Sequence, residues 1–416
     1  MNGAEKLNHG RTAYHFQPAK YWQNGPMYHN GMYHFFYQYN PRGPTWGDGK
    51  LSWGHSVSGD LVNWADVGNA LDPTSPFDVN GCWSGSATVL PGGRPAILYT
   101  GMDDADKAQV QNVAFAKNPS DPLLREWEKP SCNPVIPMPA DVTGNNFRDP
   151  TEAWRGRDGL WRGAVAAEVR GVGSLLVYRS ADFLHWERNA GAPLHAASSR
   201  DGDGPAVLEC PDLFPMAGTR RDGGARRVGE PRRGAGTLQA DVQAVFEVPN
   251  LEDAETLDPK WLQDPKGLCA EKGASVPGGV GPFGLLVMAS GDLREHTSIF
   301  FRVFKHLDTY KVLMCTDLTK SSTKAEGVKI PSYGAFLDVD VEKDKSLSLR
   351  TLIDHTVVES FGDGGRTCMT PRRSAEHAAG SRSRLYAFNY GAGAVKVSKL
   401  EAWELATAAV NGGGVI

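Results

Sequence analysis

Two acidic motifs carry the side chains best suited to chemistry. Arg148-Asp149-Pro150 stands directly before a strand-like run, and an arginine beside a carboxylate keeps it ionised and can orient it. Glu209-Cys210-Pro211-Asp212 lies where an apolar run meets a loop. A glutamate among apolar neighbours has a raised pKa, which a general acid near neutral pH requires. Taken alone, either motif is equally compatible with a surface turn or a structural ion pair.

Aromatic and polar side chains in the N-terminal half add features of a sugar-binding site. Tryptophan rings can stack on the apolar faces of a sugar, and amides or hydroxyls can hydrogen-bond its hydroxyl groups. The alternative for any single tryptophan is ordinary core packing. The candidates are Trp22, Trp46 and Trp83 for stacking, and Asn24, Gln38 and Ser84 for hydrogen bonding.

Other chemistries lack their motifs. The sequence has no G-x-S-x-G elbow, no P-loop and no paired-histidine spacing for a metal, so we expect neither a metal nor a cofactor. The six cysteines include no C-x-x-C pair, which argues against a structural zinc site and leaves one or two disulfides possible. A net charge of −4 implies no attraction to nucleic acid or to an anionic membrane.

Two features of the sequence bear on the cellular compartment. No apolar run reaches the length of a membrane span. The first residues, MNGAEKLNHGRTAY, are polar and lack the apolar core of a signal peptide, which read literally predicts a cytosolic chain. The alternative is that Met1 is not the native start.

The elements that would position these side chains are mostly strands. Asn30-Gly31 between two aromatic runs is a strong hairpin signal, and Gly92-Gly93 and Asp158-Gly159 separate further strand pairs. An internal repeat joins SGDLVNW (58–64), SDPLLREW (120–127) and SADFLHW (180–186), whose tryptophans lie 63 and 59 residues apart. A recurring hairpin unit with an aspartate turn and a locking tryptophan indicates propeller blades, although three similar loops could arise by chance.

The pattern changes after Met216. Residues 217–240 include an arginine- and glycine-rich stretch with almost no large apolar side chain, so we interpret them as a linker that cannot fold alone. Strand patterning resumes at 241, and seven short strands with turn signals up to about 410 predict an antiparallel β-sandwich. The chain is therefore predicted to be all-β, with a partial propeller at 12–216, a linker at 217–240 and a β-sandwich at 241–410.

Six motifs make the chain resemble plant acid invertases of the cell-wall type, in glycoside hydrolase family 32. They are HFQP (15–18), YQYNP (37–41), WSGSAT (83–88), FRDP (147–150), ECPD (209–212) and DHTVVESFGDGG (354–365). The resemblance implies a five-bladed propeller plus a β-sandwich. It also implies retaining hydrolysis of terminal β-fructofuranosides, chiefly sucrose, by a carboxylate nucleophile and an acid/base.

The resemblance assigns roles and a location. It makes Glu209 the acid/base and Asp149 the stabiliser of the transition state through sugar hydroxyls, with Arg148 among the substrate-binding residues. It also implies a disulfide between Cys269 and Cys315. A relative of this type would be secreted to the apoplast or cell wall, with a possible association with cell-wall polysaccharide.

The chain departs from the family pattern in two places. The family nucleophile is the aspartate of W-x-N-D-P-N-G, whereas this sequence has Trp22-Gln23-Asn24-Gly25, without the Asp-Pro-Asn step. An active glycosidase would need another group in place of that aspartate, and the nearby candidates are Asp48 and Asp212, neither of them in the motif. The family also carries its fourth and fifth blades where the linker stands here, so we expect about three of five blades. The chain is therefore predicted to be a β-fructofuranosidase with turnover in doubt, with a catalytically dead sugar-binding or regulatory relative, or a defective gene product, as alternatives.

Overall fold

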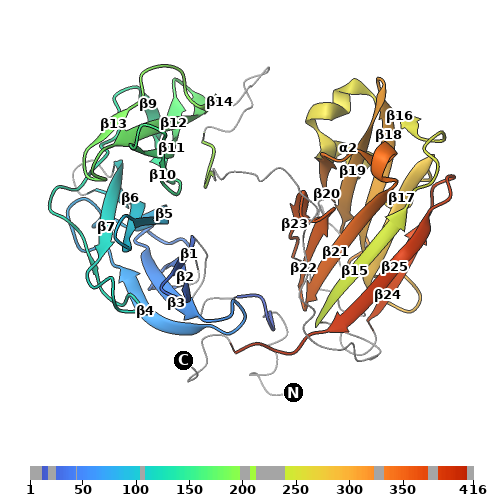
Figure 1. Cartoon of the computed structure of the whole chain (residues 1–416), viewed down its shortest axis with the longest axis horizontal. Helices are drawn as coiled ribbons and strands as arrows, with labels where there is room; N and C mark the ends of the chain where they lie inside the picture. Colours follow the sequence, from blue (N-terminus) through green and yellow to red (C-terminus); the bar gives the residue numbers. More distant parts are fainter. Residues whose placement is uncertain are drawn as a thin grey trace. The chain divides into compact units, whose positions relative to one another are not determined.

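The computed structural model describes residues 12–16, 25–43, 45–103, 108–196, 207–211, 239–322, 332–372 and 383–409. The chain divides into two compact units (Figure 1). One unit comprises residues 16–223 and 409–416, and the other comprises residues 1–15 and 224–408. In the described part of the chain, no helix is long and apolar enough to cross a membrane.

The first unit is a partial propeller, whose described residues form three consecutive antiparallel sheets. The first sheet has the order β1 (Pro26–His29), β2 (Met32–Tyr39), β3 (Ser52–Ser58) and β4 (Ala65–Leu71). The second has the order β5 (Cys82–Leu90), β6 (Arg94–Met102), β7 (Gln109–Ala116) and β8 (Trp127–Glu128). We call these sheets blades 1 and 2.

Blade 3 is more irregular than the other two. Its order is β10 (Trp154–Arg155), β11 (Trp161–Val169), β12 (Val172–Ser180) and β13 (Trp186–Arg188). Two more strands share its edges: β9 (Val142–Arg148) pairs with β11, and β14 (His195–Ala196) pairs with β12. Since β9 and β10 follow one another along the same edge of β11, the chain leaves that edge after Arg148 and returns at Trp154.

The predicted aspartate–tryptophan repeat is confirmed, and each copy has the same local geometry. The indole N–H groups of Trp64, Trp127 and Trp186 donate to the carbonyl oxygen three residues earlier, at 3.2, 2.9 and 3.0 Å. In all three copies that earlier residue has a positive φ, between 44° and 68°. The preceding aspartate accepts backbone N–H groups of the turn, as Asp60 does from Val62 at 2.8 Å. The aspartate therefore shapes each turn and the tryptophan closes it.

Adjacent blades are joined by apolar side chains. Phe36 and Trp53 of blade 1 share a core with Ile97 and Tyr99 of blade 2, and all four are fully buried. A second core joins blade 2 to blade 3 through residues such as Leu98, Phe147 and Val165. The antiparallel sheets of the three blades therefore bury their faces against each other, as layers around a shared apolar core do.

The second unit is an antiparallel β-sandwich, as predicted. One sheet has the order β23 (Thr367–Met369), β22 (Val357–Gly362), β21 (Ser346–Asp354), β15 (Gln239–Glu247) and β25 (Lys396–Glu404). The other has the order β20 (Ser332–Leu337), β19 (Thr309–Asp317), β18 (Thr297–His306), β17 (Val280–Ala289) and β24 (Arg384–Asn389), with β16 (Glu255–Thr256) parallel to β18. Phe246 from the first sheet contacts Phe283 and Phe301 from the second in their shared core.

The described residues of the sandwich unit also form three short helices that the strand pattern does not predict: η1 (Pro259–Gln263), α2 (Pro265–Lys272) and α3 (Val341–Asp344). Asp264 caps α2 by accepting the N–H of Gly267, and Pro265 occupies its first turn, which are standard start signals. Cys269 of α2 forms a disulfide with Cys315 of β19, the pair that the resemblance implies. The bridge holds α2 against its sheet.

Residues 12–15 belong to the sandwich unit, whereas the sequence interpretation starts the propeller at residue 12. The reason is Asp354, which accepts hydrogen bonds from the backbone N–H groups of Ala13, Tyr14 and His15 at 2.6, 2.9 and 2.8 Å. Similarly, β15 begins at Gln239, within the expected linker 217–240, because it pairs with β21 from that residue onward. Residues 217–238 lie outside the described residues.

Candidate functional site

Asp149 is fixed at the end of β9 in an unusual backbone conformation. Its φ is +64°, a region that non-glycine residues rarely adopt. The Asp149 N–H donates to Thr100 Oγ1 at 3.0 Å, and Asp149 Oδ2 accepts the Cys210 N–H at 2.9 Å. Since the side chain is buried, these contacts hold the carboxylate in one orientation.

Arg148 connects the two acidic motifs. Its Nη2 donates to Glu209 Oε1 at 2.9 Å, and its Nε lies 4.0 Å from Asp149 Oδ2. Its Nη1 donates to Asn146 Oδ1 at 2.8 Å, which anchors the guanidinium from behind. The Arg-Asp-Pro and Glu-Cys motifs, 61 residues apart, therefore meet at one guanidinium group.

The two carboxylates occupy different surroundings. Burial raises the pKa of Asp149 above its ordinary value, although the Cys210 N–H and the Arg148 cation act to lower it. Glu209 has a largely exposed side chain, so it can reach a ligand. A buried acceptor beside an accessible carboxyl group is an arrangement that can bind sugar hydroxyls and protonate a leaving oxygen.

Cys210 and Ser84 bring β5 into the same site. The Cys210 Sγ lies 3.9 Å from Ser84 Oγ. Burial raises the pKa of the Cys210 thiol to about 11, and the Asp149 charge acts in the same direction. The thiol is therefore protonated near neutral pH and is not a nucleophile there.

A supporting network behind Asp149 was missed by sequence reasoning. Gln109 Oε1 accepts the Phe147 N–H at 2.9 Å, and Gln111 Nε2 donates to the Phe147 carbonyl at 2.8 Å. Gln111 Oε1 in turn accepts the Thr100 hydroxyl at 2.8 Å, the same hydroxyl that receives the Asp149 N–H. The available signal was the pair of glutamines in QVQNV, a polar interruption of an otherwise buried strand.

Trp46 and Trp83 form an aromatic corner. Their rings meet edge to face, with centroids 4.9 Å apart. The indole N–H of Trp83 donates to the Gly49 carbonyl at 2.9 Å, and the Trp83 carbonyl accepts the Trp53 indole N–H at 2.9 Å. Trp46 is partly exposed, and Trp83 precedes Ser84 directly, so the corner adjoins the acidic residues through β5.

Gln38 lies on β2 opposite Trp53 and is 95% buried. Within the described residues its buried Nε2 has no hydrogen-bond partner. Gly25 has no side chain that could contact a ligand. Its carbonyl oxygen accepts the Phe36 N–H at 3.3 Å. A Cβ added to Gly25 would lie 3.6 Å from the Gly85 carbonyl, so the chain reaches β1 beside the strand that carries Ser84.

The structure does not bring every predicted residue into this group. Trp22, Asn24 and the acid Asp212 lie outside the described residues. Asp48 is exposed and forms an ion pair with Arg42 Nη1 at 2.5 Å in the loop before β3. That contact engages Asp48 with its own loop.

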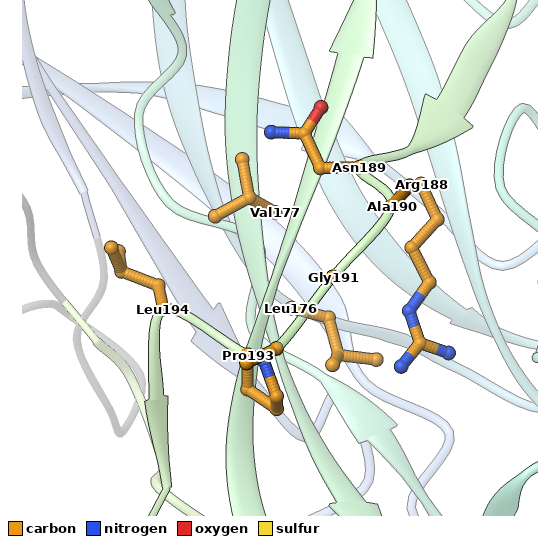
Figure 2. Close-up of a pocket in the computed structure, with 9 residues that line it drawn as sticks. Leu176, Val177, Arg188, Asn189, Ala190, Gly191, Pro193 and Leu194 are labelled. Atoms are coloured by element: carbon orange, nitrogen blue, oxygen red, sulfur yellow. The ribbon is translucent and has the colours of Figure 1, made fainter.

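A small pocket lies elsewhere, on blade 3 (Figure 2). It is formed by Leu176 and Val177 of β12 and by residues 188–194, and none of the predicted site residues line it. Arg188, on its rim, is held by Asp141 through hydrogen bonds of 2.8 and 2.9 Å.

Comparison with known proteins places the whole chain in one group. The model of the glycosyl hydrolases family 32 N-terminal domain matches residues 15–244, and that of the C-terminal domain matches residues 225–404. Beta-fructofuranosidase, insoluble isoenzyme 5, of Oryza sativa subsp. japonica is 56% identical, covering 99% of this chain and 93% of the rice protein. Fructan 6-exohydrolase of Triticum aestivum is 48% identical, covering 96% and 91%.

Solved structures agree with these matches. Fructan 1-exohydrolase IIa from Cichorium intybus has a TM-score of 0.81 and 36% identity, covering 96% of this chain and 98% of that chain. A variant of the chicory enzyme, solved in complex with 1-kestose, has a TM-score of 0.82. The alignment with the rice protein is 512 positions long, whereas this chain has 416 residues. At least 96 aligned positions of the rice protein therefore have no counterpart in this chain.

Proposed function

Because this chain belongs to glycoside hydrolase family 32, we propose that Asp149, Arg148 and Glu209 form a β-fructofuranosidase-type site for sucrose and other terminal β-fructofuranosides. The observation that carries the proposal is the double contact of Arg148, at 2.9 Å to Glu209 and 4.0 Å to Asp149. In this site Glu209 is the acid/base. Asp149 accepts hydrogen bonds from fructose hydroxyls.

The sugar ring would lie between the acidic residues and the aromatic corner. Trp46 and Trp83 offer apolar ring surface, while Ser84 and the unpartnered Nε2 of Gln38 offer polar contacts. Trp22 and Asn24 join this group by family resemblance. A site with apolar walls and a few polar groups at their edges suits a furanose ring, whose hydroxyls must each find a partner on burial.

Hydrolysis by this chain is expected to be close to background. A retaining mechanism needs a carboxylate nucleophile about 5–5.5 Å from the acid/base, and the sequence after Asn24 lacks the Asp-Pro-Asn step that supplies it in the family. Without that carboxylate no covalent glycosyl-enzyme forms, which removes several orders of magnitude of rate. The proposed molecular function is therefore fructoside recognition by an invertase-type site with little turnover.

The second candidate is a non-catalytic sugar-binding or regulatory role at the same location. The Arg148–Glu209 ion pair favours it, because a hydrogen bond of 2.9 Å engages the carboxylate that would otherwise be free to meet the substrate. We also propose that the chain acts in the cell wall, as the insoluble rice isoenzymes it resembles suggest, and that residues 217–240 stand in place of two family blades.

Ligand binding tests the proposal without requiring turnover. Thermal-shift and calorimetric titrations with sucrose, fructose and 1-kestose should give saturable stabilisation, whereas glucose alone should give little. Asp149→Asn should abolish the response, and Arg179→Ala, which removes an exposed pair with Glu187 on the same blade, should leave it intact. Equal behaviour of all sugars, or binding that survives Asp149→Asn, would refute the assignment of this site.

A further inference from the structure

Strand β25 is the outermost strand of its sheet in the sandwich unit. Among the described residues it pairs with β15 alone, and Figure 1 shows it at the margin of that sheet. Eight of its nine residues are exposed, Trp403 being the exception. A strand of this length leaves a row of backbone N–H and C=O groups available for another strand.

The face of β25 that continues the core surface carries two exposed aliphatic side chains. Leu400 stands opposite Ala244 and Val397 stands opposite Phe246, and both residues of β15 are buried. Leu400 itself is 46% exposed and Val397 is 41% exposed. Two large aliphatic side chains on an open strand edge are typical of a surface that another element covers.

The charges of β25 are arranged with opposite signs in its two halves. Lys396 and Lys399 precede Leu400, while Glu401 and Glu404 follow it. In an antiparallel pair of identical strands centred on Leu400, Lys399 of each copy faces Glu401 of the other. The lysine half of one strand then lies along the glutamate half of the other, which gives attractive cross-strand contacts. Parallel pairing would instead place lysine beside lysine.

We infer that β25 is a self-association edge: two copies of this chain pair through antiparallel β25 strands around a two-fold axis at Leu400. The two five-stranded sheets become one continuous sheet, and the two Leu400 side chains meet on the same face. An isologous contact of this kind is self-complementary and closes at a dimer. Edge lysines ordinarily discourage strand addition, but here they match only an antiparallel copy of their own strand.

The predicted contact is small, and we expect a dissociation constant in the micromolar range. Sedimentation velocity of the full chain between about 1 and 100 µM should show a reversible monomer–dimer equilibrium. Lys399→Glu or Glu401→Lys alone should weaken the dimer by roughly tenfold or more, because each homodimer then contains two like-charge contacts. Each variant should keep the unfolding temperature of the parent, since these side chains are about half exposed.

An experiment that mixes the two variants distinguishes loss of an ion pair between two copies from loss of an ion pair within one chain. Lys399 and Glu401 also form an ion pair of 3.1 Å within one strand, which either substitution removes. A heterodimer of Lys399→Glu with Glu401→Lys has opposite charges at both crossing positions, so mixing should restore dimerisation to near the parent level. Mixing cannot restore a pair within one chain.

Charge reversal on another exposed pair supplies the matched control. Lys117→Glu, in the propeller unit, should leave the dimer unchanged. A parent chain that remains monomeric at 100 µM, single variants that dimerise as the parent does, or a mixture that stays monomeric would each overturn the inference.

Discussion

The Nη2 atom of Arg148 lies 2.9 Å from Oε1 of Glu209 and donates a hydrogen bond to it. Asp149, the next residue, accepts a backbone N–H from Cys210, the residue after Glu209. Two hydrogen bonds therefore join the Arg148-Asp149 dipeptide to the Glu209-Cys210 dipeptide. These two contacts place both acidic side chains at one location.

Removing the Arg148 side chain should leave Glu209 without its hydrogen-bond donor and weaken ligand binding. Arg148→Ala is expected to weaken sucrose binding by at least about tenfold, because charge-assisted hydrogen bonds contribute roughly 1.5–3 kcal/mol each. Isothermal titration calorimetry measures the change, and Arg179→Ala on the same blade is the control. Unchanged affinity in Arg148→Ala would show that Arg148 orients neither carboxylate for the ligand.

Asp149→Asn should separate stability from binding. Burial raises the pKa of Asp149. Between about pH 3.8 and the pKa of Asp149 in the folded protein, the folded state therefore binds more protons than the unfolded state. The free energy of unfolding accordingly falls as pH rises through that window. At neutral pH the buried charge is therefore a cost, and the neutral asparagine should leave the unfolding temperature equal or higher while abolishing binding. A clear loss of unfolding temperature would contradict this balance.

A buried histidine pair in blade 1 should make the propeller unit sensitive to mild acid. His34 Nδ1 and His55 Nε2 lie 2.9 Å apart, and both side chains are fully buried. Burial, together with neighbouring His29, lowers the pKa of His34 to about 4, and burial lowers that of His55 well below its ordinary value. Because the unfolded state binds these protons first, stability should be complete above pH 6.5 and fall as pH drops toward 4.

Thermal unfolding between pH 4.5 and 7.5 measures this effect. A shift like that of His34 corresponds to roughly 3 kcal/mol, or several degrees in unfolding temperature. Replacing both histidines by glutamine should flatten the profile. Carboxylates with depressed pKa values, such as Asp60 at about 2, lose their contribution only below pH 4 and do not obscure the window. An equally steep profile in the double variant would exclude the histidine pair as its cause.

The sandwich unit should instead weaken in alkali. Burial acts to lower the pKa of His15, but hydrogen bonds to Asp354 and Glu359 outweigh it and raise the pKa to about 9. The stabilisation is fully present below pH 6.5 and lost as pH rises through 9. His15→Ala should destabilise this unit by about 1–3 kcal/mol at pH 7 and show less alkaline dependence. Chemical denaturation at pH 7 and 9.5 compares the two proteins, and identical pH dependence would argue against this role.

Much of the fold was predictable because local rules determine it. Asn30 and Gly31 both have positive φ values, as a tight two-residue hairpin requires, and His29 pairs with Met32 across them. The repeated tryptophans closed their turns as the repeat suggested. By contrast, strand patterning does not predict α2, although Asp264, Pro265 and Gly273 mark both of its ends.

The candidate site was only partly predictable, because its contacts are non-local. Motifs drew attention to Arg148, Asp149 and Glu209, but nothing in their spacing shows which guanidinium nitrogen meets which carboxylate. The supporting glutamines of β7 resemble any polar residues on a strand until β9 is placed beside them. Residue types therefore indicated the chemistry, and tertiary packing decided which side chains take part.

Restoring the family nucleophile tests whether the rest of the machinery is competent. Inserting Asp-Pro-Asn after Asn24 should raise sucrose hydrolysis if the absent blades are dispensable, because Glu209 and Asp149 are already in contact with Arg148. The same insertion combined with Glu209→Gln is the control and should be inactive. Activity of equal size in both insertion variants would show that Glu209 is not the acid/base.

The central claim is tested most directly by the release of glucose and fructose from sucrose by the purified 416-residue chain, followed over hours at high protein concentration. The account predicts a rate that equals the rate of its Glu209→Gln variant and stays near the uncatalysed background, because no carboxylate follows Asn24 to attack the anomeric carbon. Robust hydrolysis that Glu209→Gln abolishes would contradict it and would require a different nucleophile in this chain.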